Sequence, residues 1–96
     1  MRYRGTNQRS QQPAISVTFD SASMGDVLET FASFSGKSIV MGSGVSGERV
    51  TTRITNQPWD VALKSILDGY GLAAVEDSTG IIRVDTLAEF FAVVGR

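Results

Sequence analysis

Cysteine and histidine are both absent from this sequence of 96 residues. Their absence excludes thiol nucleophiles, disulfide bonds, histidine-based catalytic triads and the usual zinc or copper sites. Long apolar runs are missing as well, since the stretch 87–94 is interrupted by Glu89 and is far too short to cross a bilayer. The commonest catalytic machinery is therefore not available, and we expect a protein that is not an enzyme and that holds no cofactor or metal.

Positive and negative charges nearly balance, with a formal net charge of −1, but they are unevenly distributed along the chain. Arg2, Arg4 and Arg9 are the charged residues of the first thirteen, whereas the remainder carries ten acids against six bases. A nucleic-acid-binding domain concentrates positive charge on its folded part, so we expect no nucleic-acid partner. Residues 1–13 are polar and lack the apolar core of a secretory signal, which predicts an unstructured basic lead or linker.

The composition beyond this lead is that of one small globular domain, with 42% hydrophobic and 20% charged residues. Apolar and polar residues alternate over 15–20, which predicts a half-buried strand. Ser23 stands three residues before Asp26 in a capping-box pattern, and the apolar residues that follow recur at helical spacing. We therefore expect a helix over 23–35, followed by a short apolar strand over 38–41.

The second half of the chain shows the same alternation of strand and helix patterns. β-Branched residues dominate 48–55, which predicts another strand. Pro58 suits the first position of a helix, and the apolar stripe that follows it continues at helical spacing to residue 70. Two further strands, 72–76 and 81–85, flank the hairpin turn Asp-Ser-Thr-Gly.

The predicted order is β-α-β-β-α-β-β over residues 14–85. Two helices with one apolar face each need sheets to cover them, so we expect an α+β fold. Residues 86–96 are either a helix that docks on the domain or the start of a following domain. Trp59 could anchor a partner, but its place in the apolar stripe favours the core. The expected core residues are Phe19, Leu28, Phe31, Ile39, Ile54, Trp59, Ala62, Leu63, Ile66, Leu67, Leu72 and Val84.

Three glycines, Gly42, Gly44 and Gly47, match the G-x-G-x-x-G pattern of dinucleotide-binding loops. That pattern needs a following helix whose N-terminus holds the pyrophosphate, and here a strand follows. The G-x-x-G of RNA-binding KH domains fails for a related reason, because its loop must clamp the nucleic-acid backbone between helices. We interpret the segment as a flexible loop between strands, and we expect no small-molecule substrate.

Two ordered series of short motifs extend over most of the domain. The first is Ile-Ser-Val-Thr-Phe-Asp at 15–20, Asp-Val-Leu at 26–28 and Phe-Ser-Gly at 34–36. The second is Val-Thr-Thr-Arg-Ile at 50–54, Pro-Trp-Asp at 58–60 and Ile-Arg-Val at 82–84. Together they resemble the short N-terminal domain of secretins and TonB receptors. The run Thr-x-Arg-Ile followed by Pro-Trp-Asp-x-Ala-Leu is most similar to type IV pilus secretins.

This resemblance implies two helices between a mixed three-stranded sheet and a two-stranded sheet. It also implies the periplasmic part of an outer-membrane secretin, which docks inner-membrane or periplasmic assembly proteins of a type IV pilus or type II secretion-like machine. Neighbouring copies of the chain would be further partners in a secretin ring. The alternative is the signalling domain of a TonB-dependent receptor, which contacts an anti-sigma regulator.

Exposed strand edges are the surface on which we expect partners to bind. An edge offers unpaired N–H and C=O groups to another chain, and alternate side chains add selectivity. Two predicted strands carry short polar side chains that leave their backbone accessible. The predicted partner-binding residues are Ser16, Val17, Thr18, Thr51, Thr52 and Arg53.

Overall fold

The structure, a computed structural model, describes the main chain of residues 11–94 and the side chains of residues 11–90. In chain order the elements are β1 (Ala14–Ser23), α1 (Met24–Ser35), β2 (Ile39–Met41), β3 (Arg49–Pro58), α2 (Trp59–Gly69), β4 (Leu72–Glu76), β5 (Ile82–Thr86) and α3 (Leu87–Val94). The predicted order of strands and helices is confirmed, and a third helix follows it.

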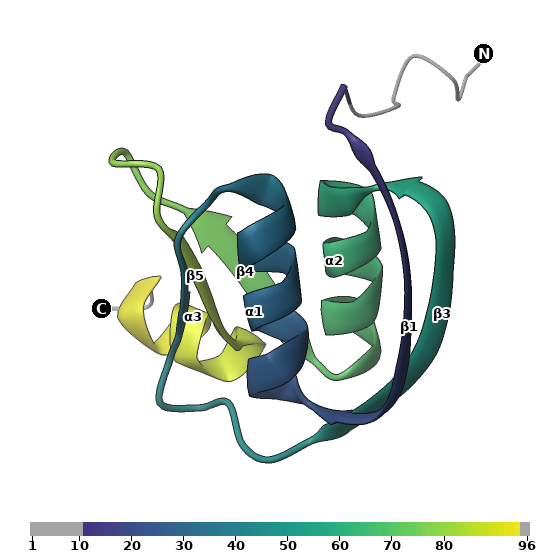
Figure 1. Ribbon diagram of the computed structural model, residues 1–96. Helices are drawn as coiled ribbons and strands as arrows, with labels where there is room; N and C mark the ends of the chain where they lie inside the picture. The colour runs from purple at the N-terminus through teal and green to yellow at the C-terminus, as the bar shows by residue number, and fades with distance from the viewer. Residues whose placement is uncertain (1–10, 95–96) are drawn as a thin grey trace, which may run out of the picture.

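Two sheets enclose the first two helices, as Figure 1 shows. Strand β1 pairs antiparallel with β3 in one sheet. The other sheet has the order β2-β5-β4, in which β2 runs parallel and β4 antiparallel to β5. Helices α1 and α2 lie side by side between the sheets and bury their apolar faces against both. The predicted α+β fold, with its two-stranded and mixed three-stranded sheets, is confirmed.

Helix α1 begins and ends at the signals that the sequence contains. The hydroxyl of Ser23 accepts a hydrogen bond from the Asp26 N–H at 3.1 Å, which satisfies one of the unpaired amides of the first turn. At the other end Gly36 has a φ of 74°, and its N–H donates to the Ala32 carbonyl. Glycine adopts this left-handed conformation without steric cost, so the chain can turn toward β2.

Helix α2 begins at Trp59, directly after Pro58. The Trp59 backbone N–H donates to the Pro13 carbonyl at 3.0 Å, and its indole N–H donates to the side chain of Gln12 at 3.0 Å. Gln12 and Pro13, which the sequence assigns to the predicted unstructured lead, lie outside any helix or strand but are hydrogen-bonded to Trp59. The first ten residues lie outside the described part of the chain.

The core lies between the two sheets. Of the residues expected there, ten are buried, whereas Ile39 and Ile54 are only partly buried. Ile39 lies on the edge strand β2, and Ile54 lies in the two-stranded sheet, which has one layer of helices to pack against. Further buried residues complete the core: Ile15, Met24, Val27, Val50 and Ile82.

Residues 87–94 form helix α3, which packs against β5. The hydroxyl of Thr86 accepts from the Glu89 N–H at 3.1 Å at its start, and the Arg83 guanidinium lies 5.9 Å from the ring centroid of Phe90. Residues 87–94 are thus helical and lie against β5. Within the described part of the chain, no helix has the length and apolar character needed to cross a membrane.

Candidate interaction surface

The six predicted partner-binding residues lie in a single sheet. Ser16, Val17 and Thr18 belong to β1, and Thr51, Thr52 and Arg53 belong to β3. The two strands are direct neighbours, with Val17 opposite Ile54 and Thr18 opposite Arg53. Sequence patterns indicated two strands with accessible backbone, and the fold joins them into one surface.

Only four of the six side chains face outward. Ser16, Thr18, Thr51 and Arg53 are exposed, whereas the side chains of Val17 and Thr52 are partly buried. The reason is the alternation of side chains along a strand, which turns Val17 and Thr52 toward the helices. Val17 and Thr52 can therefore offer a partner mainly their backbone, as strand residues, and little of their side chains. We call the outward residues of β1 and β3, namely Ser16, Thr18, Asp20, Thr51, Arg53 and Thr55, the β1–β3 face.

Irregular pairing interrupts this sheet at two places. The register of β1 against β3 shifts between Ile15 and Val17 and again between Phe19 and Ala22. Near these shifts Ser21 has a φ of 54° and Asn56 a φ of 53°, a region that residues with side chains seldom adopt. The strain marks places where the surrounding structure holds the backbone in an uncommon shape.

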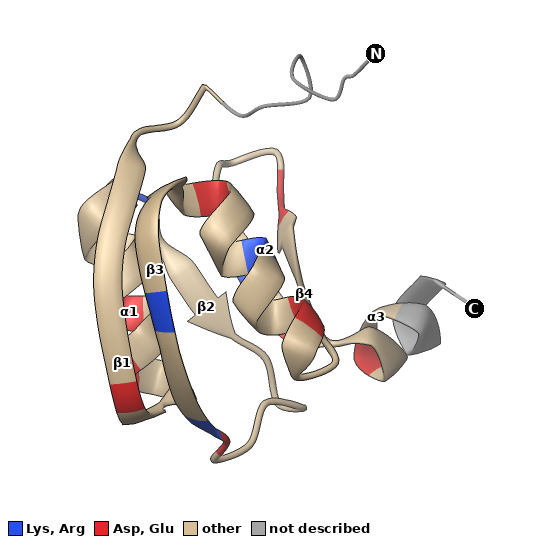
Figure 2. Cartoon of the chain, turned by 90° about the vertical axis from the view of Figure 1, so that its right-hand side faces the viewer, with Lys and Arg blue, Asp and Glu red and all other residues tan. Residues whose placement is uncertain are grey.

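Two hydroxyls of the β1–β3 face accept hydrogen bonds from backbone N–H groups of these irregular segments. The Asn56 N–H donates to the Ser16 hydroxyl at 2.9 Å, and the Ser21 N–H donates to the Thr51 hydroxyl at 3.0 Å. Each bond satisfies a backbone amide that the shifted ladder leaves without its usual partner. Thr18 and Arg53 are thus the better placed of the predicted residues for contact with another chain. Figure 2 shows that most of the ribbon of β1 and β3 is uncharged.

A buried carboxylate, which the sequence analysis missed, holds the glycine-containing loop against β5. The side chain of Asp85 is 0% exposed, and its Oδ1 accepts from the N–H groups of Gly44 (3.0 Å) and Thr86 (2.8 Å). Its Oδ2 lies 3.5 Å from the Arg83 guanidinium. A Cβ atom at Gly42 or at Gly44 would clash with this carboxylate. The two glycines therefore permit close packing on Asp85, and the prediction of a merely flexible loop was incomplete.

The hydrogen bonds of Asp85 connect the loop after β2 with the end of β5. The described residues contain no group of three histidine, cysteine, aspartate or glutamate side chains that could hold a metal ion. A signal for Asp85 was present in the sequence, because it continues an apolar strand and two glycines stand near β2. Only the pairing of β2 with β5 brings these segments together.

The turn between β4 and β5 contains a carboxylate with a lowered pKa. Hydrogen bonds from the Thr79 hydroxyl, and then from the backbone N–H groups of Ile81 and Thr79, hold the pKa of Asp77 below its usual 3.8. These donors stabilise the charged form of the carboxylate. Asp77 is fully exposed and closes the turn, so it gives the predicted hairpin its shape.

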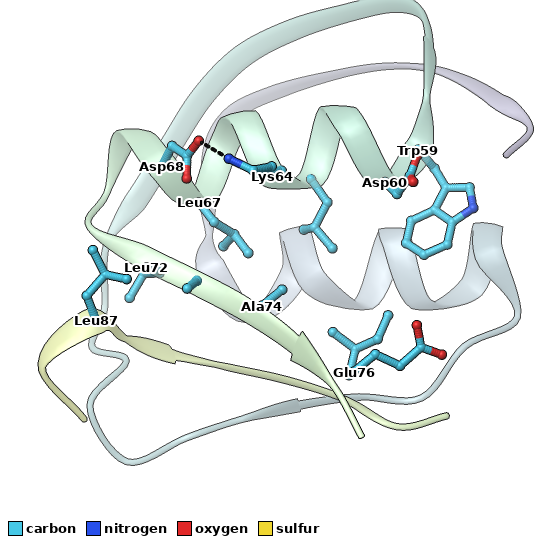
Figure 3. Close-up of a pocket in the computed structure, with 12 residues that line it drawn as sticks. Trp59, Asp60, Lys64, Leu67, Asp68, Leu72, Ala74, Glu76 and Leu87 are labelled. Carbon is cyan, nitrogen blue, oxygen red and sulfur yellow. Dashed lines mark hydrogen bonds and ion pairs between the residues drawn. The ribbon is translucent and has the colours of Figure 1, made fainter. Parts of the chain in front are cut away.

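A groove runs between α2 and the edge strand β4. Its volume is about 480 Å³, and Figure 3 shows it with Trp59 and Glu76 at one end and Leu72 and Leu87 at the other. Ala74 lies in the middle of this groove and is exposed, although it is opposite the fully buried Val84. We call this the α2–β4 groove; its lining residues are Trp59, Asp60, Leu63, Lys64, Leu67, Asp68, Leu72, Ala73, Ala74, Glu76, Ile82 and Leu87.

Comparison with known proteins gives matches among solved structures. The N0 domain of the type II secretin from enterotoxigenic Escherichia coli superposes with a TM-score of 0.68 at 20% identity, over 80% of this chain and 99% of that chain. The fold is that of a secretin N0 domain. The predicted resemblance to the short N-terminal domain of secretins is thereby confirmed at the level of the fold.

Two larger structures contain the same fold. The structure of XcpQN012 matches with a TM-score of 0.63 at 14% identity, over 83% of this chain and 38% of that chain. The GspC–GspD complex from the type II secretion system of enterotoxigenic Escherichia coli matches with a TM-score of 0.59 at 21% identity, over 78% of this chain and 57% of that chain. No family profile matches the sequence, and a search of curated proteins finds no match.

Proposed function

We propose that this chain is a non-catalytic interaction domain in the periplasmic part of an outer-membrane secretin. In this role it docks an inner-membrane assembly protein of a type II secretion-like or type IV pilus machine. The observation that carries the proposal is the superposition on 99% of an isolated secretin N0 domain. A GspC–GspD complex that contains the same fold supports a protein as the partner.

The chemistry of the chain agrees with a binding role. Without cysteine or histidine it has neither a thiol nucleophile nor an imidazole base. Helices α1 and α2 lie between the two sheets and bury their apolar faces there. The outward side of the β1–β3 sheet presents mainly strand backbone and short hydroxyl side chains, which suit recognition by hydrogen bonds and shape.

Within the β1–β3 face we assign the main contact to Arg53 and its neighbour Thr18. Both are exposed and lie opposite each other on adjacent strands. Arginine is enriched among the residues that dominate binding energy, because one guanidinium combines five donors with a flat apolar surface. The neighbouring threonines of β3, Thr51 and Thr55, would exclude water from this contact.

Calorimetric titration of the full chain tests this function. The titrants are the periplasmic regions of an inner-membrane assembly protein of type II secretion, of its type IV pilus counterpart, and of an anti-sigma regulator. We expect binding to one of the first two. Arg53→Glu should weaken it by at least about tenfold if the face is buried in the complex. Glu29→Lys, a charge change of the same size and opposite sign on the exposed side of α1, is the control and should leave the affinity within about twofold.

The outcomes separate the function from the surface. Binding of the anti-sigma regulator alone would replace the secretin assignment with the TonB-receptor alternative. Binding to an assembly protein that Arg53→Glu leaves unchanged would retain the function and move the contact to another face. If none of the three binds, the proposed function is wrong.

A further inference from the structure

Strand β4 has an open edge that lacks the usual protection against another strand. It is the last strand in the order β2-β5-β4, and its pairing with β5 is regular throughout Leu72–Glu76. It contains no proline, lysine or arginine, and Val75 is 50% exposed. Edge strands are commonly protected by bulges, prolines or lysines, and β1 and β3 are indeed bulged. The other edge strand of this sheet, β2, is also paired regularly but has only three residues, so β4 is the longest regularly paired strand edge among the described residues.

The α2–β4 groove lies directly beside this edge. Its floor consists of buried apolar side chains of α2, with Trp59, Leu63 and Leu67 one helical turn apart. Ala74 is small and exposed, so the inward side of β4 is not filled by its own side chain. A strand added to β4 would point every second side chain into this groove.

Carboxylates outnumber bases along the groove. Asp60, Asp68 and Glu76 line it together with one ammonium group, that of Lys64. Lys64 pairs with Asp68 at 2.9 Å, and Lys37 reaches Glu76 at 2.8 Å from outside the groove. Both ion pairs are exposed and contribute little to stability. Their carboxylates can therefore leave the lysine and bind an incoming cation instead. Asp60 and Asp68 stand on α2, where the end of a long basic side chain lying along the apolar floor can reach them.

We propose that the α2–β4 groove binds an extended segment of a partner protein, added as a strand to β4. Its groove-facing side chains alternate between apolar and long basic residues. The main chain of the segment pairs with β4, the apolar side chains fill the space above Ala74, and the basic ends reach the carboxylates of α2 and Glu76. This site is separate from the β1–β3 face and does not depend on the function proposed above.

Two other occupants fit the groove less well. A second copy that paired through its own β4 would bring Glu76 into a groove that is already acidic. Residues 1–10 are basic, but neither register of every second residue places apolar and basic side chains next to each other: one reads Met-Tyr-Gly-Asn-Arg and the other Arg-Arg-Thr-Gln-Ser. A segment from another protein is therefore the occupant that both the apolar floor and the charge favour.

The test is titration of the ¹⁵N-labelled full chain with the peptide acetyl-Thr-Lys-Thr-Leu-Thr-Lys-Thr-amide, followed by backbone amide shifts. Every second position of this peptide presents lysine or leucine to the groove, and the threonines face away. We expect saturable shifts in residues 72–76 and in the groove side of α2. The same peptide with glutamate in place of lysine should bind at least about tenfold more weakly.

Two substitutions locate the site on the protein. Ala74→Leu fills the groove and should weaken binding by at least about tenfold, whereas Ser65→Leu, on another side of α2, should leave it unchanged. If Ala74→Leu does not fold, Glu76→Lys provides the second variant and should weaken binding of the lysine peptide while improving that of the glutamate peptide.

Three results would overturn the proposal. The first is the absence of shifts in β4 at millimolar peptide, and the second is binding that Ala74→Leu and Glu76→Lys leave unchanged. The third is tighter binding after deletion of residues 1–10, because it would make this segment of the chain the natural occupant. Unchanged affinity after that deletion supports a partner protein.

Discussion

At the scale of single residues, the packing of two glycines on Asp85 decides how the loop between β2 and β3 is held. A Cβ at Gly44 would lie 2.5 Å from Asp85 Oδ1 and 3.0 Å from Thr86 Oγ1, whereas a Cβ at Gly47 would meet nothing within 4 Å. Packing therefore requires glycine at position 44 of this loop but not at position 47.

Replacement of Gly44 by alanine should lower the free energy of unfolding by about 1–3 kcal/mol, because the added methyl group must displace a buried carboxylate. Gly47→Ala, the matched control, should change it by less than about 0.5 kcal/mol. Urea unfolding of both variants measures the difference. Equal midpoints would show that the loop yields freely and that Asp85 does not hold it.

Asp77 gives a prediction about pH. Because its pKa in the folded chain lies below 3.8, its contribution to stability is present above pH 3.8 and is lost as the pH falls through the folded pKa. A carboxyl ¹³C titration should therefore show a midpoint below 3.8. Thr79→Ala removes the hydroxyl that donates to the Asp77 carboxylate, so it should move the titration midpoint back toward 3.8. Ser78→Ala removes a hydroxyl that is not among these donors and should leave the midpoint unchanged. A midpoint at or above 3.8 in the parent chain would contradict the hydrogen bonds described for this turn.

At the scale of elements, local patterns predicted the five strands and the first two helices, left α3 open, and did not predict which strands pair. The alternation of apolar and polar residues over 15–20 and 48–55 reflects which side of each strand is buried. This local pattern was enough to predict both segments as strands. Their pairing depends on contacts far apart in the sequence, and no periodicity reports them. For the same reason the parallel pairing of β2 with β5, which brings Asp85 under the loop glycines, was beyond the sequence alone.

The interaction surface was predictable to a similar degree. Short polar residues indicated β1 and β3, and the fold placed them together. The bulges could not be foreseen, because the left-handed conformation of Ser21 and Asn56 arises from the register of the paired strands. Those bulges engage the hydroxyls of Ser16 and Thr51, which sequence reasoning had left available for a partner.

Trp59 links the start of α2 to the residues before β1, and its side chain is 4% exposed. Trp59→Ala should lower the free energy of unfolding by about 3–5 kcal/mol, since it leaves a cavity beside Leu63. Trp59→Phe keeps most of the apolar volume and loses the bond to Gln12, so its effect should be clearly smaller. Thermal or urea unfolding checks both variants. If Trp59→Ala unfolds like the parent, the indole does not belong to the core.

At the scale of the whole molecule, α1 and α2 lie between the two sheets, and each sheet has a side or an edge that is open to other chains. This arrangement leaves two surfaces on which we propose that other proteins bind. The β1–β3 face presents hydroxyls and one guanidinium, and the α2–β4 groove presents a regular edge beside apolar side chains. The β1–β3 face is the outward side of the two-stranded sheet, whereas the α2–β4 groove lies beside an edge that the three-stranded sheet leaves open.

The central claim is that this domain docks another protein through the β1–β3 face. Its most direct test follows the backbone amide signals of the ¹⁵N-labelled chain during addition of the periplasmic region of an inner-membrane assembly protein. We predict that the signals of residues 16–18 and 51–53 shift and saturate. Unchanged signals in both strands, at concentrations where the partner is shown to bind, would contradict the account.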